Sequence, residues 1–410
     1  MKRVISFFVM TSLCPLAALA QEAEPGGVYF TFDLAQTFRA STDRDLETTA
    51  AEDGLESLTA LSFGAVTETR SQRLSFNLDT TLNFTDGEFS QEGLVARLDY
   101  SRNSADALFD FSVQSRREDI AFLRDATDFI NDEGEIVLPD DFDDLTGTGI
   151  RAETTVSASL TWGETAPVGY RISTSLEALR YEDASATLID ADSATFGFGV
   201  RLNINEVVTS NITLSYEETD EIGGPTTETT TLSGALTFAR PLGDLTTRIS
   251  LSRDEEEDMF WSASVSRELA LPNGNLTGGF GVVEDEGGDP RLTGRIGFSY
   301  PLPSSQIDLN AVHSLAPGDD RAATTVSASY TQELNAISNM QIGFDFGQTN
   351  DTDGSDVILT GSLSARYGYS LTEDWQLTVG ASANFREDAG VRTDSTSVFV
   401  TFERPFSWRP

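Results

Sequence analysis

The sequence predicts an all-β fold, a transmembrane antiparallel up-and-down β-barrel of about 20 strands, within a range of about 16 to 22. Three observations predict it. Stretches of about ten residues alternate between apolar and small polar side chains along most of the chain. No stretch approaches the ~18 consecutive apolar residues of a membrane-spanning helix. Acidic residues gather in every second connection between the alternating stretches.

The clearest alternating stretch covers 375–386. Every second residue from Trp375 to Phe385 is apolar or aromatic, whereas the residues between them are polar or glycine. Successive side chains of a strand point to opposite sides of a sheet, so one face would meet lipid and the other a wet interior. Trp375 and Phe385 would then lie in the two aromatic girdles that border the apolar band of such barrels.

Residues 1–20 have the pattern of a cleavable secretory signal peptide. Lys2 and Arg3 precede an apolar run, and small residues end the segment before Gln21. The one cysteine of the sequence, Cys14, lies inside this segment. We therefore expect two parts, a signal peptide at 1–20 and a β-barrel without disulfides at 21–410.

Acidic residues dominate the charge of the chain. The sequence has 66 Asp and Glu against 27 Lys and Arg, a formal net charge of −39 at pH 7. Phosphate contacts need clustered positive charge, so the composition argues against nucleic acid as a partner. The hydrophobic fraction of 39% is low for a helical membrane protein, and the polar interior face of a barrel explains it.

The predicted strands follow one another at regular intervals. The first five, which precede the longest connection, are 28–39, 55–67, 72–84, 91–100 and 106–117. The next seven are 150–162, 168–181, 193–203, 207–216, 228–239, 244–253 and 259–268. The last eight are 274–283, 291–300, 306–314, 321–332, 338–347, 356–370, 375–386 and 391–404.

The connections support this division of the chain independently. Those after odd-numbered strands hold most of the acids, as at 182–192, 217–227 and 254–258. Those after even-numbered strands are short and contain proline or glycine, as at 240–243 and 301–303. Membrane barrels have long loops at one end and short turns at the other, so a miscount by one strand would scramble the segregation.

On this pattern the chain resembles the porin-like outer-membrane β-barrel proteins of Gram-negative bacteria. Three features carry the resemblance: a strand at 28–32 soon after the signal, a C-terminal strand at 397–402 like the assembly signal of such barrels, and a long third outer loop at 118–149. The resemblance implies an outer-membrane location with the N-terminus and short turns in the periplasm and the acidic loops outside. It also implies contact with outer-membrane lipid and lipopolysaccharide, and with the barrel-assembly machinery through the last strand.

The third outer loop and a set of arginines are the candidate site. In general porins the third loop narrows the lumen, and here it carries the acidic residues Asp140, Asp141, Asp143 and Asp144. The predicted inward face carries nine candidate pore-lining arginines: Arg73, Arg97, Arg151, Arg171, Arg201, Arg248, Arg295, Arg366 and Arg386. An acidic loop that faces these arginines would set a transverse field across a constriction.

A second interpretation of the same residues stays open. In it, the loop lies outside as a solvated acidic lobe. The arginines then form scattered ion pairs with acids of the wall, namely Asp79, Asp99, Asp110, Glu177 and Asp345.

No catalytic, cofactor or metal site is expected. His313 and Ser314 are adjacent, so on a strand they point to opposite faces and cannot form a catalytic pair. The acidic stretch 351–356 departs from a calcium loop, because Thr349 and Thr360 stand where carboxylates are needed.

The leading hypothesis is an outer-membrane channel for passive diffusion of small hydrophilic solutes, with mild cation preference. One rival is a non-conducting structural or surface-interaction barrel whose acidic loops bind divalent cations or lipopolysaccharide. A third hypothesis is an export conduit for an acidic polysaccharide. The sequence leaves the oligomeric state open.

Overall fold

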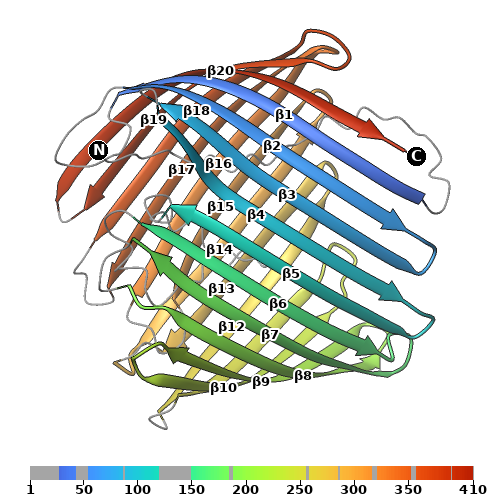
Figure 1. Cartoon of the computed structure of the whole chain (residues 1–410). Coiled ribbons are helices and arrows are strands. Elements are labelled where there is room, and N and C mark those ends of the chain that lie inside the picture. The colour runs from blue at the N-terminus through green and yellow to red at the C-terminus, as the bar shows by residue number, and fades with distance from the viewer. Residues whose placement is uncertain are drawn as a thin grey trace.

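The computed structural model describes residues 27–42, 54–85, 88–119, 149–183, 188–254, 258–284, 287–315, 321–351, 357–388 and 390–409 (Figure 1). The predicted signal peptide lies outside these residues. Within them, no helix has the length and apolarity needed to cross a bilayer.

Twenty β-strands make up the described fold, and each predicted stretch corresponds to one of them. They are β1 (Gly27–Thr42), β2 (Gly54–Glu68), β3 (Gln72–Thr85), β4 (Glu88–Asn103), β5 (Ala107–Asp119), β6 (Ile150–Trp162), β7 (Val168–Glu182), β8 (Ala191–Asn205), β9 (Val208–Glu221), β10 (Thr226–Phe238), β11 (Leu245–Arg253), β12 (Met259–Leu271), β13 (Gly274–Glu284), β14 (Pro290–Leu302), β15 (Ser305–Leu315), β16 (Arg321–Asn335), β17 (Ser338–Asp351), β18 (Ile358–Ser370), β19 (Gln376–Asp388) and β20 (Val391–Trp408).

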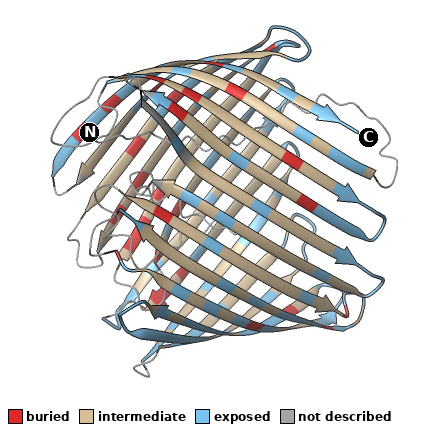
Figure 2. Ribbon diagram, in the orientation of Figure 1, coloured by how far each residue is buried: buried red, intermediate tan, exposed pale blue. Residues whose placement is uncertain are grey.

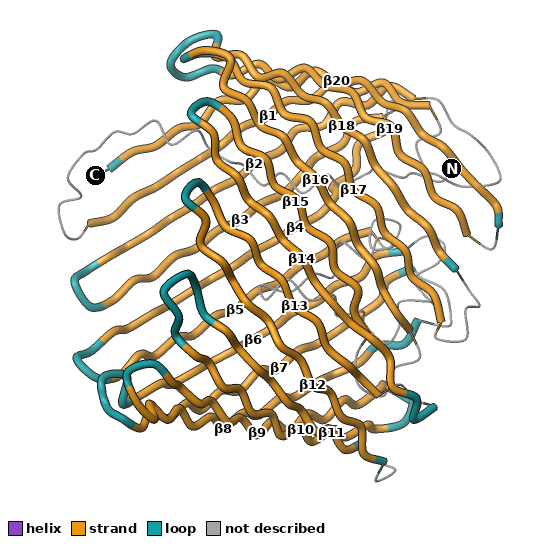
Figure 3. The backbone as a smooth tube through the Cα atoms, turned by 180° about the vertical axis from the view of Figure 1, so that it is seen from behind, coloured by secondary structure: helices purple, strands orange, loops and turns teal. Residues whose placement is uncertain are grey.

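The strands form one closed antiparallel sheet. Each strand pairs with its neighbours in the chain, and β1 also pairs with β20, so the sheet has no free edge. The view from behind shows the wall continuing around the far side (Figure 3). Closure satisfies the backbone N–H and C=O groups of the first and last strands, which would otherwise be exposed. The predicted up-and-down barrel of about 20 strands is confirmed.

Several strands are longer than predicted. β4 begins at Glu88 and ends at Asn103, and β20 continues to Trp408. At β4 the backbone ladder continues into polar ends where the hydrophobic alternation has faded, so the pattern underestimates strand length. At β20 the predicted strand stops at Arg404, before Pro405, although outward aromatic residues follow at Phe406 and Trp408. β4 also contains a bulge at Gly93, where φ is +62° and the register with β3 shifts. Glycine suits this position because it takes positive φ without steric cost.

The pairing register gives every strand residue one of two faces. Large apolar side chains lie exposed on one face, for example Phe84, Leu176 and Phe280, which is 69% exposed. The opposite face carries small polar residues, and several are buried, among them Ser382 and Thr401. Side chains crowd together on a concave surface and spread apart on a convex one, so the apolar face is the outside of the barrel. Most of the wall has intermediate burial (Figure 2).

Aromatic rings gather on the outward face near the short-turn end of the strands. Phe30 of β1 stacks on Trp408 of β20 with ring centroids 5.0 Å apart, and it also stacks on Phe63 of β2 at 6.4 Å. Farther around the wall, Trp162 stacks on Tyr170 at 5.4 Å. These rings form one aromatic girdle, and the first pair closes the seam between the two ends of the chain.

Candidate functional site: the inward face of the barrel

All nine candidate arginines lie on the inward face. For example, Arg366 is opposite Gln341 on one side and Gly380 on the other. The same parity holds for Arg73, Arg97, Arg151, Arg171, Arg201, Arg248, Arg295 and Arg386. That these residues line a conducting pore stays a prediction.

The arginines are spread over the height of the wall and form no single ring. Five lie near the short-turn end of their strands: Arg73, Arg171, Arg201, Arg248 and Arg366. Arg151 and Arg386 lie near the end with the long connections. The others, Arg97 and Arg295, lie between. A solute that crosses the barrel would therefore meet positive charge at successive depths.

Arg201 shows that one of these side chains supports the wall itself. Its Nη2 donates hydrogen bonds to the carbonyl oxygens of Gly163 at 2.8 Å and Glu164 at 2.6 Å. Both acceptors belong to the turn between β6 and β7, which lies beside β8. Arg201 therefore holds this turn against the neighbouring hairpin.

Four charges alternate in sign on the inward face at the ends of β5 and β6 that the longest connection joins. Arg116 Nε lies 2.5 Å from Glu118 Oε1 on β5, and Arg151 pairs with Glu153 on β6. The register places Arg116 opposite Glu153 and Glu118 opposite Arg151. Arg151 is buried, so this charge square neutralises a guanidinium that solvent hardly reaches.

Ion pairing along a single strand also occurs deeper in the wall. Arg97 Nε donates to both carboxylate oxygens of Asp99 at 2.9 Å. This is one of the pairings that the second interpretation of the sequence expects. Asp345, another acid that this interpretation names, accepts a hydrogen bond from Ser362 Oγ at 3.2 Å.

Hydroxyl groups bridge neighbouring strands on the same face. Thr37 and Thr401 approach to 2.8 Å across the β1–β20 seam, and Ser382 and Ser397 approach to 2.8 Å between β19 and β20. Similar pairs are Ser112 with Ser157, Thr231 with Ser252 and Thr237 with Thr246. The inward surface is therefore polar beyond its charged residues, as a water-filled interior requires.

The acidic residues predicted to form a constriction, Asp140, Asp141, Asp143 and Asp144, lie outside the described residues. At the long-connection end the structure does describe Arg392, whose guanidinium donates to both oxygens of Asp394.

His313 lies on the outward face, where its Nδ1 is 2.8 Å from Thr324 Oγ1. The register puts Ser314 on the opposite face, as the sequence predicts. In the described part of the chain, no group of three or more His, Cys, Asp or Glu is arranged to hold a metal ion.

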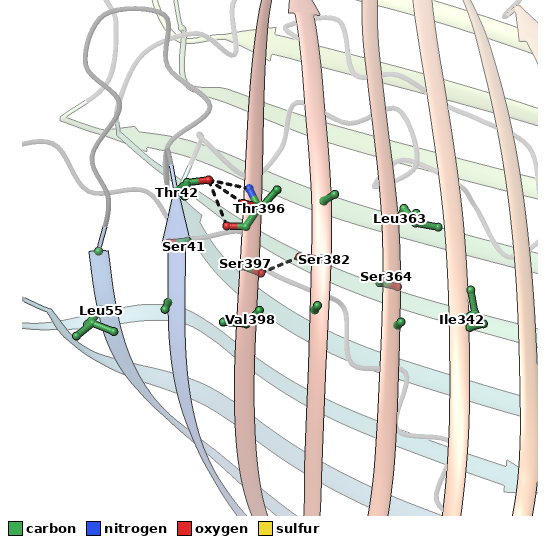
Figure 4. A pocket seen from close by; sticks show the side chains of 15 residues that line it. Ser41, Thr42, Leu55, Ile342, Leu363, Ser364, Ser382, Thr396, Ser397 and Val398 are labelled. Carbon is green, nitrogen blue, oxygen red and sulfur yellow. Dashed lines mark hydrogen bonds between the residues drawn. The ribbon is translucent and has the colours of Figure 1, made fainter.

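A shallow apolar depression of about 950 Å³ lies over the seam (Figure 4). Small residues form its floor, including Ala40, Ala381 and Ala383, and the outward side chains of Leu55 and Leu363 stand at its sides. The depression therefore belongs to the apolar outside of the barrel and adds nothing to the inward site.

Sequence reasoning missed four arginines that lie on the inward face with the nine candidates: Arg39, Arg116, Arg291 and Arg321. The available signal was their parity with polar residues of the same strands, such as Thr37 for Arg39 and Gln114 for Arg116, because residues two apart on a strand share a face.

Comparison with known proteins gives the fold and no closer relationship. No family model matches the sequence, and no curated protein matches it. Among solved structures, the ferric enterobactin receptor of Pseudomonas aeruginosa is similar with a TM-score of 0.51 and 10% identity, over 93% of this chain and 81% of that chain. OccK5 (OpdH) of the same organism matches with a TM-score of 0.42 and 10% identity, over 93% and 99%. The outer membrane protein OpdK of P. aeruginosa matches with a TM-score of 0.41 and 9% identity, over 93% and 99%. The chain thus has the fold of Gram-negative outer-membrane β-barrels.

Proposed function

We propose that the protein is a channel of the Gram-negative outer membrane through which small hydrophilic solutes diffuse passively. One observation carries the proposal. The described wall is a closed barrel of twenty strands that is apolar outside and lined inside with hydroxyl, amide and paired charged groups. A closed barrel meets the requirement that hydrocarbon places on backbone groups, and a polar inner surface retains water.

The strand number supports a passage wide enough for solutes. Barrels of eight strands are filled by their own side chains, whereas porins of about 16 to 18 strands leave an aqueous channel. A barrel of twenty strands is wider still. Its interior is therefore too large for the short inward side chains, mainly Ser, Thr and Gly, to fill.

The orientation follows from the connections. We place the N-terminus and the short turns in the periplasm and the long acidic connections outside, after removal of the signal peptide at 1–20. The acidic outer mouth would raise the local concentration of cations and give mild cation preference. We also propose that loop 118–149 narrows the lumen, with Asp140, Asp141, Asp143 and Asp144 at the constriction.

Liposome swelling tests the proposal. Liposomes that contain the refolded mature chain should swell in isotonic solutions of neutral sugars, at rates that fall as the sugar grows. A matched preparation of heat-unfolded protein controls for leakage. Folded protein that admits none of the sugars would contradict the channel and favour a structural or surface-interaction barrel.

A further inference from the structure

Arg404 is a charged side chain among aromatic rings on the outward face of the barrel. It lies on β20 between Phe402 and Phe406, and the register places it opposite Leu34 of β1. On the other side of β20 lies β19, which Trp375 directly precedes (Figure 1). This is the short-turn end of the wall, where an aromatic girdle meets the headgroups of one lipid leaflet.

Two rings hold the guanidinium of Arg404 in place. Its Cζ lies 4.5 Å from the ring centroid of Phe406 and 5.5 Å from that of Trp375. Both distances are within the range of cation–π attraction. The Arg404 side chain is 36% exposed, so the rings fix the cation at the girdle while part of it still faces outward.

The hydrogen-bond donors of Arg404 are unused within the described part of the chain. Its Nε is buried and has no acceptor there. An acidic neighbour, Asp374, has its Oδ2 3.8 Å from Nη2 of Arg404, which is too far for a hydrogen bond. A guanidinium has five N–H donors, so the Nη groups of Arg404 can donate to a further anion.

Asp374 is free to take a partner of its own. It lies in the short turn before β19, and its side chain is 67% exposed. Arg404 and Asp374 therefore present one positive and one negative group side by side at the edge of the apolar wall. A ligand that carries both charges would match this pair better than a ligand with either charge alone.

Apolar side chains continue from Arg404 toward the middle of the barrel. Phe402 lies opposite Leu377 of β19, and Val400 lies opposite Val379. A shallow apolar depression of about 810 Å³ follows, lined in part by Val379 and Val400. A molecule bound at Arg404 would therefore have its polar end in the girdle and an apolar part against the wall, as a phospholipid does.

We propose that Arg404 and Asp374 bind a phospholipid with a phosphoethanolamine headgroup, in the leaflet beside the short turns. The phosphate would accept charge-assisted hydrogen bonds from the Nη groups of Arg404. The ammonium group, which a short ethylene link joins to the phosphate, would donate to the carboxylate of Asp374. The four charges would then alternate in sign. The site lies outside the barrel, so this inference goes beyond the proposed channel function and does not depend on it.

Two other common headgroups should fit less well. Phosphatidylglycerol has the phosphate without the ammonium group, so its negative charge would face Asp374 without compensation. Phosphatidylcholine has a quaternary ammonium group, which has no N–H to donate. Phosphatidylethanolamine should therefore bind more tightly than either.

Native mass spectrometry of the refolded protein, released from detergent micelles, tests the site. The probes are dioleoyl lipids that differ only in these three headgroups. We expect phosphatidylethanolamine to bind at about 10-fold lower concentration than the other two, because neither of them can donate a hydrogen bond to Asp374. Glycerophosphoethanolamine, the same headgroup without acyl chains, should compete only at far higher concentration, which separates a lipid site from a site for the free headgroup.

Variants separate the two halves of the site. Arg404→Gln should weaken phosphatidylethanolamine about 10-fold or more, and Arg404→Lys should restore part of the binding because it keeps the charge. Asp374→Asn should keep the phosphate contact and remove the preference over phosphatidylglycerol. The control is Arg267→Gln, because Arg267 is an exposed outward arginine near the short-turn end of β12, and its loss should change neither affinity nor preference.

Each outcome has one meaning. Equal binding of the three lipids, tighter binding of phosphatidylglycerol, or binding unchanged in Arg404→Gln would overturn the site. If Arg404→Gln fails to fold, Asp374→Asn in its exposed turn decides: a retained preference for phosphatidylethanolamine overturns the proposal, and a lost preference supports it. Lipid binding is measured without ion flow, so a folded protein that never conducts would contradict the proposed function and leave this site standing.

Discussion

The ring of Trp408, the last residue of β20, stacks on Phe30 near the start of β1 with centroids 5.0 Å apart. The register places these residues directly opposite one another. Residues almost a whole chain apart thus meet on the outward face and cover the seam that closes the barrel. Barrel closure depends on this pairing, because the first strand has no other partner on that side.

Trp408→Ala should lower the free energy of unfolding of the barrel. In addition to the apolar area that is no longer buried, the loss of the stacked pair should cost about 0.5–1.5 kcal/mol, the range for one aromatic pair. The measurement is the urea midpoint of the folded form, followed by heat-modifiable migration on gels. Phe280→Ala on β13 is the control, because this outward ring is 69% exposed and far from the seam. Equal shifts in the two variants would show that the seam pair adds nothing specific.

Adjacent residues of β12 should differ in access to water. Ser264 is opposite Arg248 on the inward face, and Val265 is opposite Phe280 on the outward face. Residues 21–410 contain no cysteine, so single cysteines can be introduced into them without a background thiol. In liposomes, Ser264→Cys should react with a charged methanethiosulfonate reagent, and Val265→Cys should not. The reverse pattern would invert the assignment of the two faces.

Arg151→Gln should destabilise the barrel by about 1.5–3 kcal/mol, because Glu153 loses a charge-assisted hydrogen bond in a poorly solvated part of the wall. In a double-mutant cycle, adding Glu153→Gln should cost much less than it does alone. Arg392→Gln is the matched control, since Arg392 pairs with Asp394 at the same spacing but is exposed, and its effect should be smaller. Additive losses at 151 and 153 would show that the charge square is not coupled.

The acidic outer connections should give mild cation preference in a salt gradient, and the preference should weaken at higher ionic strength as the charges are screened. Asn replacements of Asp140, Asp141, Asp143 and Asp144 should reduce it more than Gln replacements of Glu255, Glu256 and Glu257 in another outer connection. The measurement is the reversal potential in a planar bilayer. Clear anion preference in the unmodified channel would contradict this part of the account.

The number of strands and most of the face assignments can be predicted from the sequence, whereas individual contacts cannot. The alternation at 375–386 and the acids in every second connection led to twenty strands, because both follow from the two-residue period of a strand and from alternating strand direction. In 397–402, however, Phe399 lies between two valines, so alternation cannot assign its face. The register with Gly380 does so, and it depends on two strands at once.

Other features depend on contacts that no local pattern encodes. The alternation pattern identifies Arg201 only as a polar residue of the inward face. Its guanidinium, however, donates hydrogen bonds to carbonyl oxygens of the turn between β6 and β7, nearly forty residues earlier in the chain. The charge square likewise needs the pairing of β5 with β6 across the longest connection. Long-range register decides such contacts, and one sequence does not show it.

Single-channel conductance of the refolded mature protein in a planar bilayer tests the central claim most directly, measured beside a variant that lacks residues 120–146. The account predicts steady openings for the unmodified protein and larger openings for the variant, because the third outer loop is proposed to narrow the lumen. Openings unchanged by the deletion would contradict the constriction alone. Silence from both proteins, with folding verified by heat-modifiable migration, would contradict the channel itself.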